Sequence, residues 1–221
     1  VDLKTVASVL ADVTSIPEAL LLSAANQLDA AQLLKELQKT IVSQQQGLEK
    51  IARQISSHQA GLGDPHKPIG VFLIAGPSGV GKSETAQTLA EILTGQARNL
   101  IRFNMTEFQE AHSIASLKGA PPGYVGYGVG GTLTEAVRRA PYSVILLDEI
   151  EKAHPDVLKL FYQVFDRGTL EDGEGVEVSF KNTVIVLTTN VGARAIVDAW
   201  QKTPSSAKGG DSASIQWDDL S

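Results

Sequence analysis

Apolar and polar positions divide the chain into three zones. Residues 1–60 carry apolar side chains at helical spacing, which predicts two or three helices with a break near Ser43 and Gln44. Residues 62–67 form a Gly- and Pro-containing loop that ends this zone. At the other end, residues 203–214 are rich in Ser, Gly, Lys and Asp and lack apolar anchors, which predicts a flexible loop or tail.

The middle zone alternates strand-like and helix-like segments. Short apolar runs predict strands at 69–75, 99–103, 143–147 and 183–188, and the spacing between them predicts helices at 81–94 and 155–166. The run at 143–147 is almost entirely apolar, as is typical of a parallel strand covered on both faces. This alternation predicts an α/β fold: a three-layer domain built on a mostly parallel sheet.

Composition excludes several classes of protein. No apolar run is long enough to span a bilayer, and the net charge of −6 argues against a general binder of nucleic acids or membrane surfaces. The absence of cysteine excludes disulfides and thiolate metal sites, and agrees with a reducing cytoplasm. Because the chain opens on Val1 rather than methionine, we expect a fragment of a longer protein.

The strongest chemical signal is a glycine-rich loop between the first predicted strand and a helix. It consists of Gly76, Pro77, Ser78, Gly79, Val80, Gly81, Lys82 and Ser83. Glycines let backbone N–H groups converge on phosphates, and the helix N-terminus adds positive partial charge. Lys82 would supply a mobile charge for the γ-phosphate, and the hydroxyl of Ser83 can bind Mg²⁺. The alternative, a plain turn, is far less consistent with this context, so the loop predicts ATP binding.

Two acids follow the buried strand 143–147. Asp148 is expected to hold the water shell of Mg²⁺, and Glu149 to polarise the attacking water as a catalytic base. Alone, two acids at a strand end would be unremarkable. Beside a phosphate loop they favour hydrolysis of ATP over nucleotide binding alone.

Asn190 follows the last predicted strand and is a further catalytic candidate. Its amide could orient the same water, but an asparagine at this place could equally cap the following helix. Residues 119–128 form another candidate segment, with glycines, a double proline and the aromatic tip Tyr124. Such a tip suits gripping a polypeptide by apolar contact, whereas the alternative is a structural turn.

These motifs together resemble the AAA+ ATPases, and more narrowly the second ATPase domain of the Clp-type protein unfoldases. The resemblance rests on the sequences of residues 116–127, 133–139, 141–157 and 180–184, and it extends over about residues 1–200. Residues 105–112 and 161–168 look closer to the ClpV branch, the ATPases of type VI secretion, than to the ClpB disaggregases.

The resemblance implies roles for individual residues. Tyr124 and Val125 would grip substrate in an axial pore, Asn190 would sense the γ-phosphate, and Ile41 and Val42 would contact adenine through their backbone. Four departures are visible. Ser43 stands where the family usually has glycine, Ser83 where threonine is commoner and Ala140 where a third arginine is usual, and a basic cluster is missing at 58–62.

The resemblance also implies an organisation and a function. We expect an N-terminal helical linker at 1–30, an AAA+ large ATPase subdomain at 31–200 and a flexible loop or tail at 201–221, truncated before the small helical subdomain. The whole protein would be a bacterial cytoplasmic hexamer that uses ATP and Mg²⁺ to thread polypeptide through a central pore. It would disassemble contracted type VI secretion sheaths, with sheath subunits as its substrate. A ClpB-like disaggregase and a nucleotide-switched assembly module are the alternatives. Neither nucleic acid nor a membrane is an expected partner, and the fragment alone should hydrolyse ATP weakly.

Overall fold

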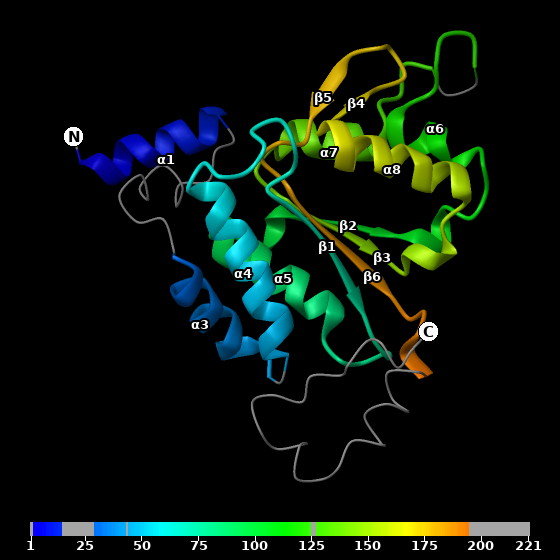
Figure 1. The fold of residues 1–221 in the computed structure, drawn as a ribbon. Coiled ribbons are helices and arrows are strands. Elements are labelled where there is room, and N and C mark those ends of the chain that lie inside the picture. The colour runs from blue at the N-terminus through cyan, green and yellow to red at the C-terminus, as the bar shows by residue number, and fades with distance from the viewer. Residues whose placement is uncertain (1, 15–28, 43, 125–126, 195–221) are drawn as a thin grey trace.

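A four-stranded parallel sheet forms the centre of the molecule in a computed structural model, which describes residues 2–14, 29–42, 44–124 and 127–194 (Figure 1). Its strands are β1 (Gly70–Ala75), β2 (Leu100–Asn104), β3 (Val144–Asp148) and β6 (Val184–Thr189), in the spatial order β1-β6-β3-β2. All three pairings are parallel. The predicted α/β sheet is therefore confirmed, with each strand within one residue of its expected start.

Helices cover both faces of this sheet, which gives three layers (Figure 1). The described α-helices are α1 (Leu3–Thr14), α3 (Ala30–Thr40), α4 (Gln45–Gln59), α5 (Lys82–Thr94), α6 (Ser113–Lys118), α7 (Thr132–Arg139) and α8 (Pro155–Arg167). Three short 3₁₀ turns complete them: η2 (Ala97–Asn99), η3 (Met105–Glu107) and η4 (Ile150–Lys152). Helix α8 starts with Pro155 at its first turn and ends at Gly168, whose φ of 67° closes the last turn in the left-handed region.

The two central strands separate two hydrophobic cores. Along β3, Ile145 and Leu147 face the core shared with α6, α7 and α8, whereas Val144 and Leu146 face the core shared with α3, α4 and α5. Strand β6 alternates in the same way, and all of its side chains are buried. Because side chains alternate across a strand, an all-apolar run satisfies both layers at once. The two cores fix the strand ends, where the polar candidates lie.

The N-terminal zone agrees with its prediction where it is described. Helix α3 ends at Thr40 and α4 begins at Gln45, and Leu33 and Leu37 are fully buried in the core shared with α4 and α5. Asp29 caps α3 reciprocally with Gln32. The division of the chain at residues 30 and 200 remains a prediction, and 201–221 lies outside the described residues.

Two features were not predicted from the sequence. Val178, which lies shortly before the fourth main strand, belongs to a separate antiparallel hairpin of β4 (Thr169–Glu171) and β5 (Glu177–Ser179). Each arm is only three residues long, too short for a periodic pattern to mark it. Helices α6 and α7 were also not predicted, because eight residues or fewer carry little periodic signal.

Strand β1 lies at one edge of the sheet. Among the described residues it pairs only with β6, and the side chain of Leu73 is 63% exposed. None of the helices in the described part of the chain combines the length and the apolar character needed to cross a membrane.

Candidate nucleotide site

The candidate site lies where β1, β3 and β6 end. The phosphate loop leaves β1 after Ala75 and enters α5 at Lys82, as the sequence predicted. Gly79 and Gly81 have φ angles of 83° and 89°, in the left-handed region that disfavours residues with a Cβ. A Cβ at Gly79 would meet no atom within 4 Å, so the loop surrounds open space there. The first turn of α5 therefore points its N–H groups toward an accessible hollow.

Lys82 is held more firmly than expected. The sequence suggested a mobile charge, but the residue is only 9% exposed. Its Nζ donates hydrogen bonds to the carbonyl oxygens of Gly76 (2.7 Å) and Pro77 (2.9 Å) and to Oδ1 of Asn190 (2.8 Å). All three ammonium donors are thus used, which offsets the cost of burying the charge. A phosphate would have to replace some of these acceptors.

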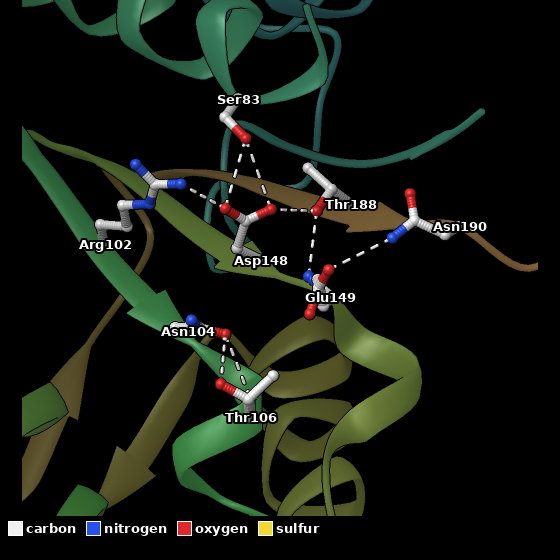
Figure 2. A network of polar contacts seen from close by, with 8 residues as sticks. All are labelled: Ser83, Arg102, Asn104, Thr106, Asp148, Glu149, Thr188 and Asn190. Atoms are coloured by element: carbon white, nitrogen blue, oxygen red, sulfur yellow. Dashed lines mark hydrogen bonds and ion pairs between the residues drawn. The ribbon is translucent and has the colours of Figure 1, made fainter. Parts of the chain in front are cut away.

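Asp148 lies at the centre of a polar network (Figure 2). Arg102 Nη2 donates to Oδ2, Thr188 Oγ1 donates to Oδ1, and Ser83 Oγ lies 3.3 and 3.4 Å from the two oxygens. Burial raises the pKa of Asp148, but the hydrogen bonds from Thr188 and Arg102 and the positive charge of Arg102 outweigh it, so the pKa is below its ordinary 3.8. Asp148 is therefore ionised at neutral pH and faces the loop hydroxyl.

Glu149 has an unusual backbone conformation. Its φ of 57° makes it the one non-glycine residue with positive φ in the part of the chain that the structure describes. The backbone N–H of Glu149 donates to Thr188 Oγ1 (3.0 Å), and its Oε1 accepts from Asn190 Nδ2 (3.3 Å) (Figure 2). A left-handed conformation at a residue with a side chain costs about 1–3 kcal/mol and is concentrated at functional sites. The strained turn directs this carboxylate toward Asn190 and away from Asp148.

Asn190 joins the loop to the acidic turn. Its amide accepts from Lys82 and donates to Glu149, while its backbone N–H donates to Glu151 Oε1 (3.1 Å). Burial raises the pKa of Glu151, but the backbone N–H groups of Glu151 and Asn190 lower it to a net value below its ordinary 4.5. Both ends of the Asn190 side chain therefore bond to residues of the site.

A cavity of about 480 Å³ opens between these groups. It is lined by Ser78, Gly79, Gly81, Lys82, Ser83, Glu84, Asn104, Asp148, Glu149, Thr188 and Asn190. The oxygens of Ser83 and Asp148 suit Mg²⁺, which prefers one or two protein oxygens together with phosphates and water. Among the described residues, no group of three or more His, Cys, Asp or Glu side chains could hold a metal ion. The oxygens of Ser83 and Asp148 fit a metal ion that also binds phosphate and water.

The two predicted adenine contacts differ in position. Ile41 is 6% exposed and packs into the core with Leu37, whereas Val42 is 82% exposed. Beside them, Gln44 Nε2 donates to the carbonyl oxygen of Val80 (2.8 Å), which ties the α3–α4 break to the phosphate loop. The break thus lies next to the loop, although their 36-residue separation hides this in the sequence.

The candidate substrate loop lies on another part of the surface. Tyr124 is 70% exposed and Tyr127 is 52% exposed, while Val125 lies outside the described residues. The base of the loop is firmly packed: Gly173 N–H donates to the carbonyl oxygen of Lys118 (2.8 Å), and Gly119 forms a bridge with Gly130. A second cavity of about 590 Å³ lies against this base, α7 and the β4–β5 turn, and it shares no lining residue with the nucleotide site.

Comparison with known proteins decides the family. Residues 67–216, well over half of the chain, match the family described as AAA domain (Cdc48 subfamily). The chain belongs to this AAA family. It is an ATPase domain of the Clp type, and the AAA assignment implies nucleotide binding.

This chain is similar to two kinds of Clp protein. It is 58% identical over 197 residues to the AAA+ ATPase ClpV1 of Pseudomonas aeruginosa, covering 89% of this chain and 22% of that protein. It is 56% identical over 165 residues to the chaperone protein ClpB of Yersinia enterocolitica, covering 75% and 18% of the two chains, and 50% identical over 200 residues to ClpB of Meiothermus ruber, covering 90% and 23%. The chain thus spans about a fifth of the length of these relatives.

Six residues in or beside the site were not found from the sequence: Gln44, Glu84, Arg102, Asn104, Glu151 and Thr188. Arg102 carried a visible signal, since it is a charged residue between the apolar Ile101 and Phe103 in a predicted strand. Thr188 ends an apolar run and looks like any β-branched strand residue. Its partner Asp148 lies 40 residues away, so only the β3–β6 pairing brings them together.

Proposed function

We propose that this domain binds and hydrolyses ATP with Mg²⁺ at the cavity between the phosphate loop and Asp148. The observation that carries the proposal is the continuous network from Lys82 through Asn190 to Glu149, with Asp148 fixed beside Ser83. It places a cation, an amide, a candidate base and a candidate metal ligand around one cavity. These are the parts that phosphoryl transfer to water requires.

The residues divide the work as follows. Residues 76–83 would bind the phosphates through backbone N–H groups, and Lys82 would add charge. Ser83 and Asp148 would hold Mg²⁺, which when bound neutralises charge on the phosphate oxygens. Glu149 would take a proton from the attacking water, and Asn190 would orient that water or the γ-phosphate. Ile41 and Val42 would contact adenine through their backbone.

We further propose that the whole protein is a homo-hexameric ring in the bacterial cytoplasm that threads polypeptide past Tyr124 and Val125. The exposed aromatic tip on a firmly packed base supports this role, because apolar contact grips varied side chains without requiring a sequence. Catalysis in a ring would also use an arginine from the neighbouring subunit, worth about 10³–10⁵ in rate in related enzymes. The isolated chain should therefore bind nucleotide well and hydrolyse it slowly.

Contracted type VI secretion sheaths are the proposed substrate, on the similarity to ClpV1 of Pseudomonas aeruginosa. The 56% identity to ClpB of Yersinia enterocolitica favours a second candidate, dissolution of aggregated protein. A nucleotide-switched assembly module is the third, and it would need no catalytic base. Glu149 beside Asn190 argues against that third role.

Two substrates given to the full-length protein test these proposals. We expect ATP-dependent shortening of sheath tubules and little effect on heat-aggregated protein, followed by light scattering and electron microscopy. Dissolution of aggregates without an effect on sheaths would replace the first candidate with the second. Phosphate release by the assembled ring that Lys82→Ala and Glu149→Gln leave unchanged would refute the proposed site itself.

A further inference from the structure

Arg102 lies in the site but has no role in the proposed chemistry. We infer that Arg102 is a tethered counter-ion that holds Asp148 in the metal-free site and is displaced when Mg²⁺ binds with nucleotide. Because Arg102 must be displaced, the site should bind Mg²⁺ more weakly than it would without Arg102, and its affinity for Mg²⁺ should depend more on bound nucleotide. The inference rests on the proposed nucleotide and metal binding, but not on hydrolysis or threading.

The sheet places the guanidinium beside the carboxylate. Arg102 pairs with Leu146 in the register of β2 and β3, and Asp148 lies two residues beyond Leu146 on the same face of β3. The long side chain therefore reaches along the strand to Oδ2 of Asp148, as Figure 2 shows. Ser83 of α5 approaches the same oxygen to 3.3 Å.

Three donors face the carboxylate of Asp148. Oδ1 accepts from Thr188 and Oδ2 accepts from Arg102, while the single hydroxyl of Ser83 lies 3.4 and 3.3 Å from Oδ1 and Oδ2. Thr188 is held in place, because its hydroxyl also accepts the Glu149 N–H, and it is fully buried. A metal held between Ser83 Oγ and Oδ2 of Asp148 would therefore compete with the guanidinium of Arg102 for that oxygen.

Exposure and charge single out Arg102 as the partner that leaves. Its side chain is 57% exposed, whereas that of Asp148 is 16% exposed, so Arg102 can turn into solvent while the carboxylate cannot. Two cations beside one largely buried carboxylate also repel each other. Ser83 is neutral and can turn its lone pairs to the metal without such repulsion. Displacing Arg102 is thus part of binding Mg²⁺.

The exposure of Arg102 also limits the size of the effect. Pairs at the surface contribute little, and one with a largely buried carboxylate contributes more, so removing Arg102 should tighten Mg²⁺ about three- to tenfold. Because coupling between two ligands is reciprocal, the same factor appears in nucleotide binding. The ratio of ADP affinity in saturating Mg²⁺ to that in EDTA therefore measures it without any turnover.

The experiment uses ADP and Mg²⁺ with the 221-residue chain, by calorimetry in EDTA and across a Mg²⁺ series. Arg102→Gln and Arg102→Met remove the charge, and both should lower the Mg²⁺ midpoint about three- to tenfold, with ADP affinity in EDTA within twofold of the parent chain. Arg102→Lys keeps a cation and should stay close to the parent. Arg53→Gln, on α4 and paired with Glu49, removes the same charge elsewhere and should change nothing.

Other outcomes decide against the inference. A Mg²⁺ midpoint unchanged or raised in both Arg102→Gln and Arg102→Met would overturn it, and a raised midpoint would mean that Arg102 supports the metal site instead. Loss of ADP binding in EDTA by both variants would likewise overturn it, since Arg102 would then serve the nucleotide. If the parent chain itself binds no ADP, the proposed nucleotide site fails together with the inference, so the two failures are distinguishable.

Discussion

The nucleotide site and the Tyr124 loop are built in opposite ways. The site is made of side chains at strand ends, buried between two cores and satisfied by one another: Lys82, Asp148 and Asn190 each have partners within it. The loop carries an exposed tyrosine on a base held by backbone contacts. Chemistry needs fixed polar groups with little water, whereas gripping a varied chain needs accessible apolar surface.

This contrast says where mutations should act. Changes at the strand ends should alter nucleotide binding and hydrolysis, and changes at the loop tip should alter work on substrate alone. The base of the loop should behave like a core, since a Cβ at Gly173 would lie 2.6 Å from the carbonyl oxygen of Ala120. Residues there should affect stability before they affect function.

The largest expected effect is on hydrolysis. Glu149→Gln removes the proposed base while keeping the shape and the contact with Asn190. Single-turnover phosphate release by the full-length ring should fall about 10²–10⁴-fold, with ADP affinity within a few-fold of the parent. Glu177→Gln, the same change on exposed β5, is the control. A rate within twofold of the parent would assign the base elsewhere.

The second-largest expected effect is on nucleotide affinity. Lys82→Ala removes a charge-assisted donor and leaves Asn190 and two carbonyl oxygens without their partner. We expect ADP affinity, measured by calorimetry on the chain, to weaken about 10- to 100-fold. Lys159→Ala on α8, whose amine pairs with Asp156, serves as the control. Equal affinity in both variants would mean that the loop does not bind phosphate.

Loss of substrate remodelling without loss of ATP hydrolysis is the result expected of a change at the loop tip. Tyr124→Ala should reduce substrate remodelling by the full-length ring about tenfold, which is typical when a tyrosine that is buried by its partner is truncated. Phosphate release should stay near the parent value. Tyr162→Ala removes a tyrosine that is 64% exposed on α8 and should leave both activities intact. Parallel loss of both activities, or of neither, in Tyr124→Ala would remove the distinction between the two regions.

The smallest effect concerns the base of the loop, where Asp172 pairs with Arg138 and accepts the N–H groups of Glu174 and Val176. Asp172→Asn should lower the free energy of unfolding by about 1–3 kcal/mol at pH 7. The hydrogen bond from Arg138 holds the pKa of Asp172 below its ordinary 3.8 despite the opposing effect of burial. This stabilisation is therefore present above pH 3.8 and is lost as the pH falls through the folded pKa.

Urea unfolding at a series of pH values checks this prediction. The difference between the parent chain and Asp172→Asn should be constant from pH 7 to pH 5 and should narrow below pH 3.8. Glu171→Gln, one residue earlier and exposed, should show no such difference. A gap that widens on acidification would contradict the role given to the ion pair.

Much of the molecule follows from the sequence alone. The apolar runs at β1, β3 and β6 specify strands because a strand buried on both faces admits little else, and the glycines around Lys82 mark a turn that few other residues permit. Asp148 and Asn190 were predictable in the same way, since the carboxyl ends of parallel strands meet at one edge.

The tertiary structure decided what those residues contact. Arg102 and Thr188 contact Asp148 across 46 and 40 residues, and only strand order and register bring them to it. Gln44 contacts Val80 across 36 residues, through the packing of the α3–α4 break beside the phosphate loop. The left-handed turn at Glu149 and the fixing of Lys82 likewise depend on neighbours far along the chain. Local pattern specifies which elements form, whereas hydrogen-bond partners depend on packing, which no short stretch of sequence contains.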